Sequence, residues 1–178
     1  MAEILNRQGF MRTSEAEALY RFYRSADRAA RLMRLSAGRL LPDGLTFAQF
    51  ELLDLLVQHA RREDAHNGVA RPGITPMAAA DELGLTRGSL TSLLNQLTAR
   101  KLAVTHADPT DRRSKQIVIT ETGRALHRHA MIEMSGFTSA VLAVFSRDQF
   151  SGVQDVLDEF VRWLETEGRL QSGASRSK

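Results

Sequence analysis

Hydrophobic residues recur at helical spacing over most of the chain, and polar residues mark where the helices begin. The first such stretch predicts a helix over about residues 14–38, with Ser14 and Glu17 at the spacing of a capping box. After a turn at residues 42–44, Thr46 and Gln49 form a second capping box. This box predicts a helix to about residue 61, followed by a polar, mobile loop over 61–73.

Two helices joined by a very short turn are predicted next. Thr75 caps the first, Pro76 occupies its first position, and Gly84 ends it. Thr86 then caps a helix to about residue 101. Its leucines fall within roughly 100° of arc, which predicts one buried stripe made of Leu90, Leu93, Leu94 and Leu97.

The remaining pattern predicts a hairpin and two further helices. Short β-like runs at 103–107 and 116–120 bracket a polar tip. Thr120 is expected to begin a long helix to about residue 145, and Ser146 with Gln149 caps a last helix. That helix carries an apolar stripe, and the tail 171–178 is expected to be disordered.

Charge and composition narrow the class of protein. The chain has 178 residues, 43% of them hydrophobic, and a net charge of only +3. Six Lys and Arg against two Asp lie between Thr86 and Ile119, which suits a nucleic-acid surface there. The absence of cysteine excludes disulfides and thiol nucleophiles. With no membrane-length apolar run and no secretory signal, we expect a cytoplasmic protein without a membrane partner.

The order of helix, tight turn, helix and basic hairpin predicts a winged helix-turn-helix. The second helix would lie in a major groove, where small and hydrogen-bonding side chains are needed and carboxylates are unfavourable. Its acid-free face offers Arg87, Thr91, Ser92, Asn95 and Gln96, and the hairpin adds Arg112, Arg113 and Lys115. Ordinary solvent exposure is the alternative for each residue alone, but the joint arrangement indicates binding of double-stranded DNA.

Three segments resemble the MarR family of transcriptional regulators: "LTFAQFELLDLL", "ITPMAAADELGLTRGSLTSLLNQL" and "ADPTDRRSKQIVITETGR". The resemblance extends over about residues 14–168. It implies a mainly α fold with a β-hairpin wing, and a homodimer held by the N- and C-terminal helices. It also implies a pseudo-palindromic operator and release by a small effector, often phenolic or otherwise aromatic. The resemblance leaves both repression and activation open, and we expect a repressor. We also expect dimerisation helices at 1–40 and 121–170 around a DNA-binding domain at 41–120.

The resemblance also assigns roles within the wing. Arg113 corresponds to an arginine that enters the minor groove, Asp111 to the acid that orients it, and Arg112 to a neighbour that contacts the DNA backbone. Two positions depart from the family pattern, because Lys101 stands where a glycine is usual and Thr105 stands near a usual arginine. The end of the second helix and the base of the wing are therefore expected to differ.

The effector site is predicted less directly. The resemblance implies a crevice between the dimerisation helices and the winged domain. Phe22, Tyr23, Met33, Phe47 and Phe50 are candidates to line it, with core packing as the alternative role for each.

Two other classes of function have less support in the sequence. An enzyme would depend on the histidines, but His127 and His129 lie about 200° apart around a helix and cannot share a metal. The sequence has no glycine-rich phosphate loop and no nucleophile elbow, so we expect no catalytic site, cofactor or metal. A winged-helix module that binds protein would require an exposed apolar stripe on the helix at 87–101.

Overall fold

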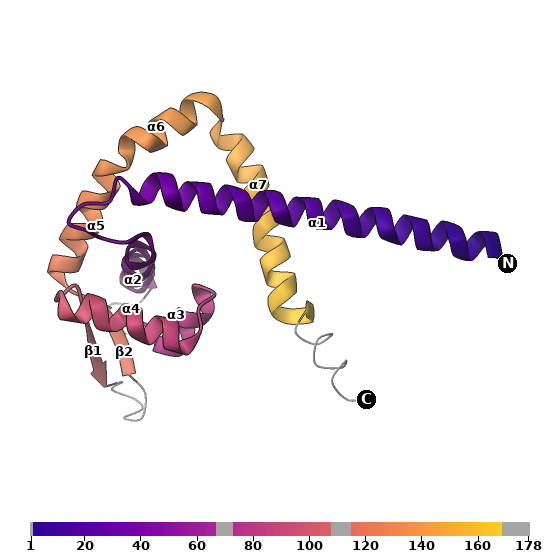
Figure 1. Cartoon of the computed structure of the whole chain (residues 1–178). Helices are drawn as coiled ribbons and strands as arrows, with labels where there is room; N and C mark the ends of the chain where they lie inside the picture. Colours follow the sequence, from indigo (N-terminus) through magenta and orange to yellow (C-terminus); the bar gives the residue numbers. More distant parts are fainter. Residues whose placement is uncertain (1, 67–72, 108–114, 169–178) are drawn as a thin grey trace. The chain divides into compact units, whose positions relative to one another are not determined.

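The computed structural model describes residues 2–66, 73–107 and 115–168, and it divides into two compact units, residues 1–134 and 135–178 (Figure 1). The first unit contains α1 (Ala2–Gly38), α2 (Phe47–His66), α3 (Pro76–Glu82), α4 (Arg87–Ala99), β1 (Ala103–Ala107), β2 (Lys115–Ile119) and α5 (Glu121–Glu133). The second contains α6 (Ser135–Val144), α7 (Arg147–Trp163) and a π-helical turn (Leu164–Gly168). This order confirms the predicted fold class, while the predicted domain boundaries stay a prediction.

Helix α2 lies at the centre of the first unit, in contact with α1, α4, α5 and β2 (Figure 1). Its Leu52 and Leu53 are fully buried. They belong to a core to which α4 and the hairpin contribute Leu90, Leu97 and Ile117, also buried. The winged region thus has a hydrophobic core of its own, which fixes α4 and the hairpin relative to α2.

Side-chain caps begin α2, α3, α4, α5 and α7 where the sequence predicted. The backbone N–H of Thr46 donates to Gln49 Oε1 (3.1 Å) and that of Gln49 to Thr46 Oγ1 (3.2 Å). Ser146 and Gln149 form the same reciprocal pair before α7. The remaining caps have their hydroxyl bonded to a backbone N–H three residues ahead, and they are Thr75, Thr86 and Thr120.

Three predicted boundaries were wrong. α1 begins at Ala2, so Ser14 lies inside it, because a capping motif permits a helix to start but does not stop one that already runs through it. α2 continues to His66 because residues 61–66 contain neither glycine nor proline. The rest of the predicted loop, residues 67–72, lies outside the described residues.

The third correction concerns the helix predicted from Thr120 to residue 145. It is interrupted at Met134, which ends α5, and α6 begins at Ser135. Serine followed by glycine (Ser135, Gly136) has low helix propensity, which accounts for a break at this point. No helix in the described part of the chain is long and apolar enough to cross a membrane.

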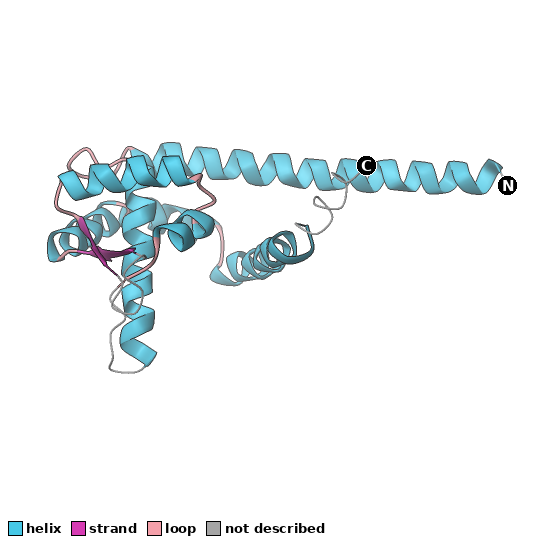
Figure 2. Ribbon diagram, turned by 90° about the horizontal axis from the view of Figure 1, so that it is seen from below, coloured by secondary structure: helices cyan, strands magenta, loops and turns pink. Residues whose placement is uncertain are grey.

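Helices α1 and α7 carry large apolar side chains that the single chain leaves exposed (α1 extends away from the winged region in Figure 2). On α1 these include Tyr20 and Leu35, each 61% exposed. On α7 the predicted stripe is largely exposed, with Val153 at 57% and Val161 at 50%. These helices therefore present apolar faces that the described part of the chain does not cover.

Candidate nucleic-acid interface

The turn between α3 and α4 is as short as the sequence predicted. Gly84 has a left-handed backbone (φ +62°), and its N–H donates to the carbonyl of Asp81 over 3.2 Å. The N–H of Leu85 donates to the carbonyl of Ala80 over 2.8 Å, which completes a Schellman motif. Thr86 follows at once as the cap of α4. The two helices are therefore held in a defined helix-turn-helix.

Burial decides which face of α4 is available. Leu90, Leu93 and Leu97 are buried in the core, and Leu94 packs against it. The apolar stripe is thus covered within the chain, which removes the feature that the protein-interaction alternative requires. The other side of the helix contains no acidic residue and exposes four candidate DNA-binding residues, Thr91, Ser92, Asn95 and Gln96.

The exposed candidates on α4 differ in what they can offer a partner. Thr91 Oγ1 donates to the carbonyl of Arg87 over 2.8 Å, so its hydroxyl can still accept a hydrogen bond. The methyl group of Thr91 makes no hydrogen bond and remains for apolar contact. Gln96 Oε1 accepts a hydrogen bond from Gln49 Nε2 over 2.8 Å. The side chains of Ser92 and Asn95 make no hydrogen bond with the described residues. Asn95 is therefore the amide whose donor and acceptor are both available.

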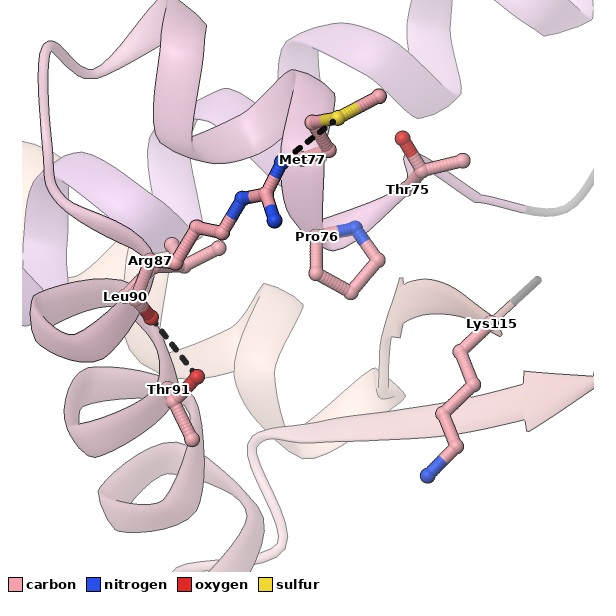
Figure 3. A pocket seen from close by; sticks show the side chains of 7 residues that line it. All are labelled: Thr75, Pro76, Met77, Arg87, Leu90, Thr91 and Lys115. Atoms are coloured by element: carbon pink, nitrogen blue, oxygen red, sulfur yellow. Dashed lines mark hydrogen bonds between the residues drawn. The ribbon is translucent and has the colours of Figure 1, made fainter. Parts of the chain in front are cut away.

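Two cations flank a hollow between α3, the start of α4 and the hairpin (Figure 3). Arg87 lies on one side, with its Nη2 3.6 Å from Met77 Sδ. Lys115, at the start of β2, lies on the other side and is exposed. The lining consists of Thr75, Pro76, Met77, Arg87, Leu90, Thr91 and Lys115. The structure thus brings two of the predicted cations to the same surface as the exposed face of α4.

The wing is a two-stranded antiparallel hairpin, as predicted, in which Ala103 pairs with Ile119 and Ala107 with Lys115. A backbone bridge between Ile74 and Ile117 attaches it to the segment before α3. Asp111, Arg112 and Arg113 lie outside the described residues, so their roles stay predictions. Thr105, where the family pattern has a nearby arginine, is exposed on β1.

Lys101, which follows the C-cap of α4, has a left-handed backbone (φ +58°). Its N–H donates to the carbonyl of Thr98, and that of Leu102 to the carbonyl of Leu97, each over 2.9 Å. This is a second Schellman motif, in which a lysine occupies the position usually given to glycine. The helix end therefore keeps the usual backbone shape despite the departure in sequence.

Thr120 joins this helix end to α5. Its Oγ1 lies 2.8 Å from the carbonyl oxygen of Lys101 and 3.0 Å from that of Leu102, and it accepts from the N–H of Gly123 over 3.0 Å. A Cβ on Gly123 would lie 2.1 Å from the carbonyl oxygen of Leu102. Packing thus explains why glycine stands three residues after Thr120.

A pair between the buried His127 and the half-buried Asp54 is a feature that sequence reasoning missed. His127 is 5% exposed, its Nε2 lies 2.8 Å from Asp54 Oδ1, and its ring stacks on Phe50 with centroids 5.5 Å apart. It follows Gly123 by four residues and precedes Ala130 by three, both buried. That spacing placed His127 on the inner face of α5, but nothing local identified Asp54 as its partner.

The predicted effector residues do not form one cluster. Phe47 and Phe50 adjoin on α2, with ring centroids 6.0 Å apart, and Phe50 is buried. Tyr23 and Met33 on α1 are 59% and 57% exposed, and Phe22 is 39% exposed. Core packing within the chain therefore fits Phe50 but not Tyr23 or Met33, and the ligand role of all five residues stays a prediction.

Comparison with known proteins agrees with this geometry. The sequence model of the MarR family matches residues 43–114. Among solved structures, the PcaV transcriptional regulator from Streptomyces coelicolor, in complex with its natural ligand, is 20% identical (TM-score 0.60), with 77% of this chain and 89% of that chain covered. CouR from Rhodococcus jostii RHA1, bound to p-coumaroyl-CoA, is 24% identical (TM-score 0.63), with coverage of 75% and 87%.

A third structure is described as the transcriptional repressor CouR bound to a 23-mer DNA duplex. It is 25% identical to this chain (TM-score 0.63), with 77% of this chain and 89% of that chain covered. No curated protein matches the sequence. Residues 43–114, which include the helix-turn-helix and the first strand of the wing, match the MarR family, and the chain shares its fold with solved winged-helix regulators. Together these matches support a winged-helix, DNA-binding transcriptional regulator.

Proposed function

We propose that the protein is a homodimeric repressor that binds a pseudo-palindromic double-stranded operator and releases it when a small aromatic effector binds. The observation that carries this proposal is the acid-free, exposed face of α4 beside a cationic hairpin. A helix of this kind can enter a major groove without placing carboxylates against phosphates.

The contacts divide into two kinds. Asn95 is suited to a base edge because its amide can donate and accept, and Thr91, Ser92 and Gln96 lie beside it on α4. Arg87 and Lys115 suit phosphates, which position the protein without reading sequence. In the wing, we assign Arg113 to the minor groove, Asp111 to its orientation and Arg112 to the DNA backbone.

The exposed apolar faces of α1 and α7 support the homodimer. Soluble monomers rarely leave large contiguous apolar surface open, and a second copy of the chain offers the same faces in return. A two-fold dimer presents two copies of α4, so its operator would repeat in inverted order. The expected place of action is the cytoplasm.

The effector proposal draws on the relatives. PcaV was solved with its natural ligand and CouR with p-coumaroyl-CoA. By analogy, we propose an aromatic effector for this chain, bound among Phe22, Tyr23, Met33, Phe47 and Phe50.

DNA binding can be tested by selecting fragments from a genomic pool and titrating the bound DNA at two salt concentrations. Because phosphate neutralisation releases counterions, the affinity should fall by at least about a hundredfold between about 50 and 200 mM salt. Affinity independent of salt would rule out the proposed function.

The wing assignment is tested by Arg113→Ala, which should weaken operator binding by about 1–3 kcal/mol while the circular dichroism spectrum stays unchanged. Arg128→Ala, an exposed arginine on α5, is the control and should leave the affinity as it is. An unaltered gel-shift titration for Arg113→Ala would contradict the assignment.

A further inference from the structure

A buried amide connects the first turn of α2 to the DNA-facing helix α4. Gln49 is 6% exposed, and its Nε2 donates to Gln96 Oε1 over 2.8 Å. Gln96 itself is exposed on α4, beside the face that carries Ser92 and Asn95. The buried Gln49 thus holds the side chain of the exposed Gln96.

The orientation of the Gln49 amide follows from its other neighbours. Gln49 Oε1 accepts from the backbone N–H of Thr46 (3.1 Å) and from Arg100 Nη1 (3.3 Å). Both groups can only donate, so the atom that faces them must be the oxygen. Arg100 is fixed in turn, because its Nη2 donates to the carbonyl of Asp43 over 3.0 Å. The NH₂ group of Gln49 is therefore the part that faces Gln96.

This orientation determines that of Gln96. An NH₂ group can only donate, so the atom of Gln96 that meets Gln49 must be its oxygen. The oxygen of Gln96 consequently lies on the side of α2, and its NH₂ group is the end left for an outside partner. An unconstrained glutamine could instead present either end to a base.

We propose that Gln49 is a specificity-determining residue that acts through Gln96 by fixing the polarity of its amide. With its NH₂ group presented to the DNA, Gln96 selects a base edge with an acceptor at that point, such as guanine O6 or N7 or thymine O4. It disfavours an edge that presents a donor there, such as cytosine N4 or adenine N6. The inference rests on the proposed role of α4 as the DNA-reading helix.

Gln49→Glu should reverse this polarity. Glutamate is a usual residue at this position of a capping box, so the variant keeps the bond from Thr46 and gains a charge-assisted one from Arg100. Its second oxygen can only accept, so Gln96 must turn its NH₂ group inward and present its oxygen to the DNA. The preferred base edge then changes from an acceptor to a donor.

The experiment is a selection of binding sites from randomised duplexes with the wild type, Gln96→Ala and Gln49→Glu. Gln96→Ala identifies the base pair that Gln96 reads, because only the preference at that pair should be lost. There the wild type should favour the acceptor-bearing base by at least about fivefold, and Gln49→Glu should favour the donor-bearing base instead. Preferences at the other positions serve as the internal control.

The inference would be overturned if Gln49→Glu selected the same base at that pair as the wild type, or if Gln96→Ala lost no preference there. Either result would leave the proposed function standing. Failure of the wild type to select any sequence would overturn both. Should Gln49→Glu not fold, Gln49→Leu removes the polar contact without adding charge. It should reduce the preference to less than about twofold, since Gln96 is then free to turn, and an undiminished preference would refute the inference.

Discussion

Helices α4 and α7 carry apolar stripes of similar spacing, yet the described residues cover only the stripe of α4. Leu97 on α4 is fully buried against the core around α2, whereas Leu164, which continues the stripe of α7, is 45% exposed. The two stripes are alike in the sequence. A hydrophobic period therefore tells which face of a helix will be covered, but not whether the same chain covers it.

The outer faces of the two helices differ as well. α4 has no acidic residue, while α7 carries Asp155, Asp158 and Glu159 away from its stripe. Carboxylates repel phosphates, so the face opposite the apolar stripe suits contact with DNA on α4 and contact with solvent on α7. The contrast supports the proposals that α4, which packs on a complete core, contacts DNA and that α7 packs against a second copy of the chain.

The largest expected effect comes from comparing a leucine of each stripe. Leu97→Ala leaves a cavity in a closed core and should lower the free energy of unfolding by about 3–5 kcal/mol in urea titration. Leu164→Ala, the matched change in the turn that continues the stripe of α7, should cost less than about 1 kcal/mol at protein concentrations where the proposed dimer has dissociated. Equal losses in the two variants would mean that the chain alone covers both stripes.

The second prediction concerns what covers α7. Val153→Asp places a carboxylate in the exposed stripe and should weaken the proposed dimer by about a hundredfold, or about 2.7 kcal/mol, since the charge would be buried unpaired. Sedimentation velocity at micromolar concentration measures this. Ser151→Asp, which adds the same charge on the polar side of the helix, should leave the dimer intact. If the wild type sediments as a monomer, it forms no dimer for Val153→Asp to weaken, and the prediction is wrong.

The smallest effect is expected where the uncovered helix α1 meets the covered core. Arg34 Nε on α1 lies 3.8 Å from Glu51 Oε1 on α2. Burial raises the pKa of the Glu51 carboxyl above its ordinary value, and the nearby Arg34 opposes this only in part. Ionisation of Glu51 therefore costs stability as the pH rises through its raised pKa.

Glu51→Gln removes that cost. Because the carboxyl is 40% exposed and screened by solvent, the variant should be more stable by only roughly 0.2–0.5 kcal/mol at pH 7. The difference should vanish below about pH 4, where glutamate is protonated in both the folded and the unfolded chain. Thermal unfolding across this range measures it, and a stabilisation that grows as the pH falls would contradict the assignment.

Local interactions account for what the sequence predicted correctly. Caps such as Thr86 and Thr120 bond to a backbone group three residues ahead, so the motif and the contact occupy the same short segment. The order of helices and the hairpin follow from such signals. The predicted start of α1 was wrong because Ser14 matches a capping motif but lies within a stretch that is helical on both sides. A local motif cannot show that the helix already began further upstream.

Contacts between distant residues account for what the sequence left out. Gln49 and Gln96 are 47 positions apart, and Asp54 and His127 are 73 apart. Neither pair produces a periodic pattern in the sequence, because each depends on how α2 packs against another helix. The sequence did identify Gln96 as a candidate reader, but its orientation follows only from the folded arrangement of Gln49 and Arg100.

The carbonyl of Leu102 has a practical consequence for protein engineering. It accepts from the backbone N–H of Thr120 and lies against Gly123, so the end of α4, the base of the wing and the first turn of α5 share one junction. A chimera that takes α4 from a MarR-family regulator would separate these parts if the graft ended at Ala99. Residues 86–123 are the unit to exchange, because only that block carries both halves of the junction.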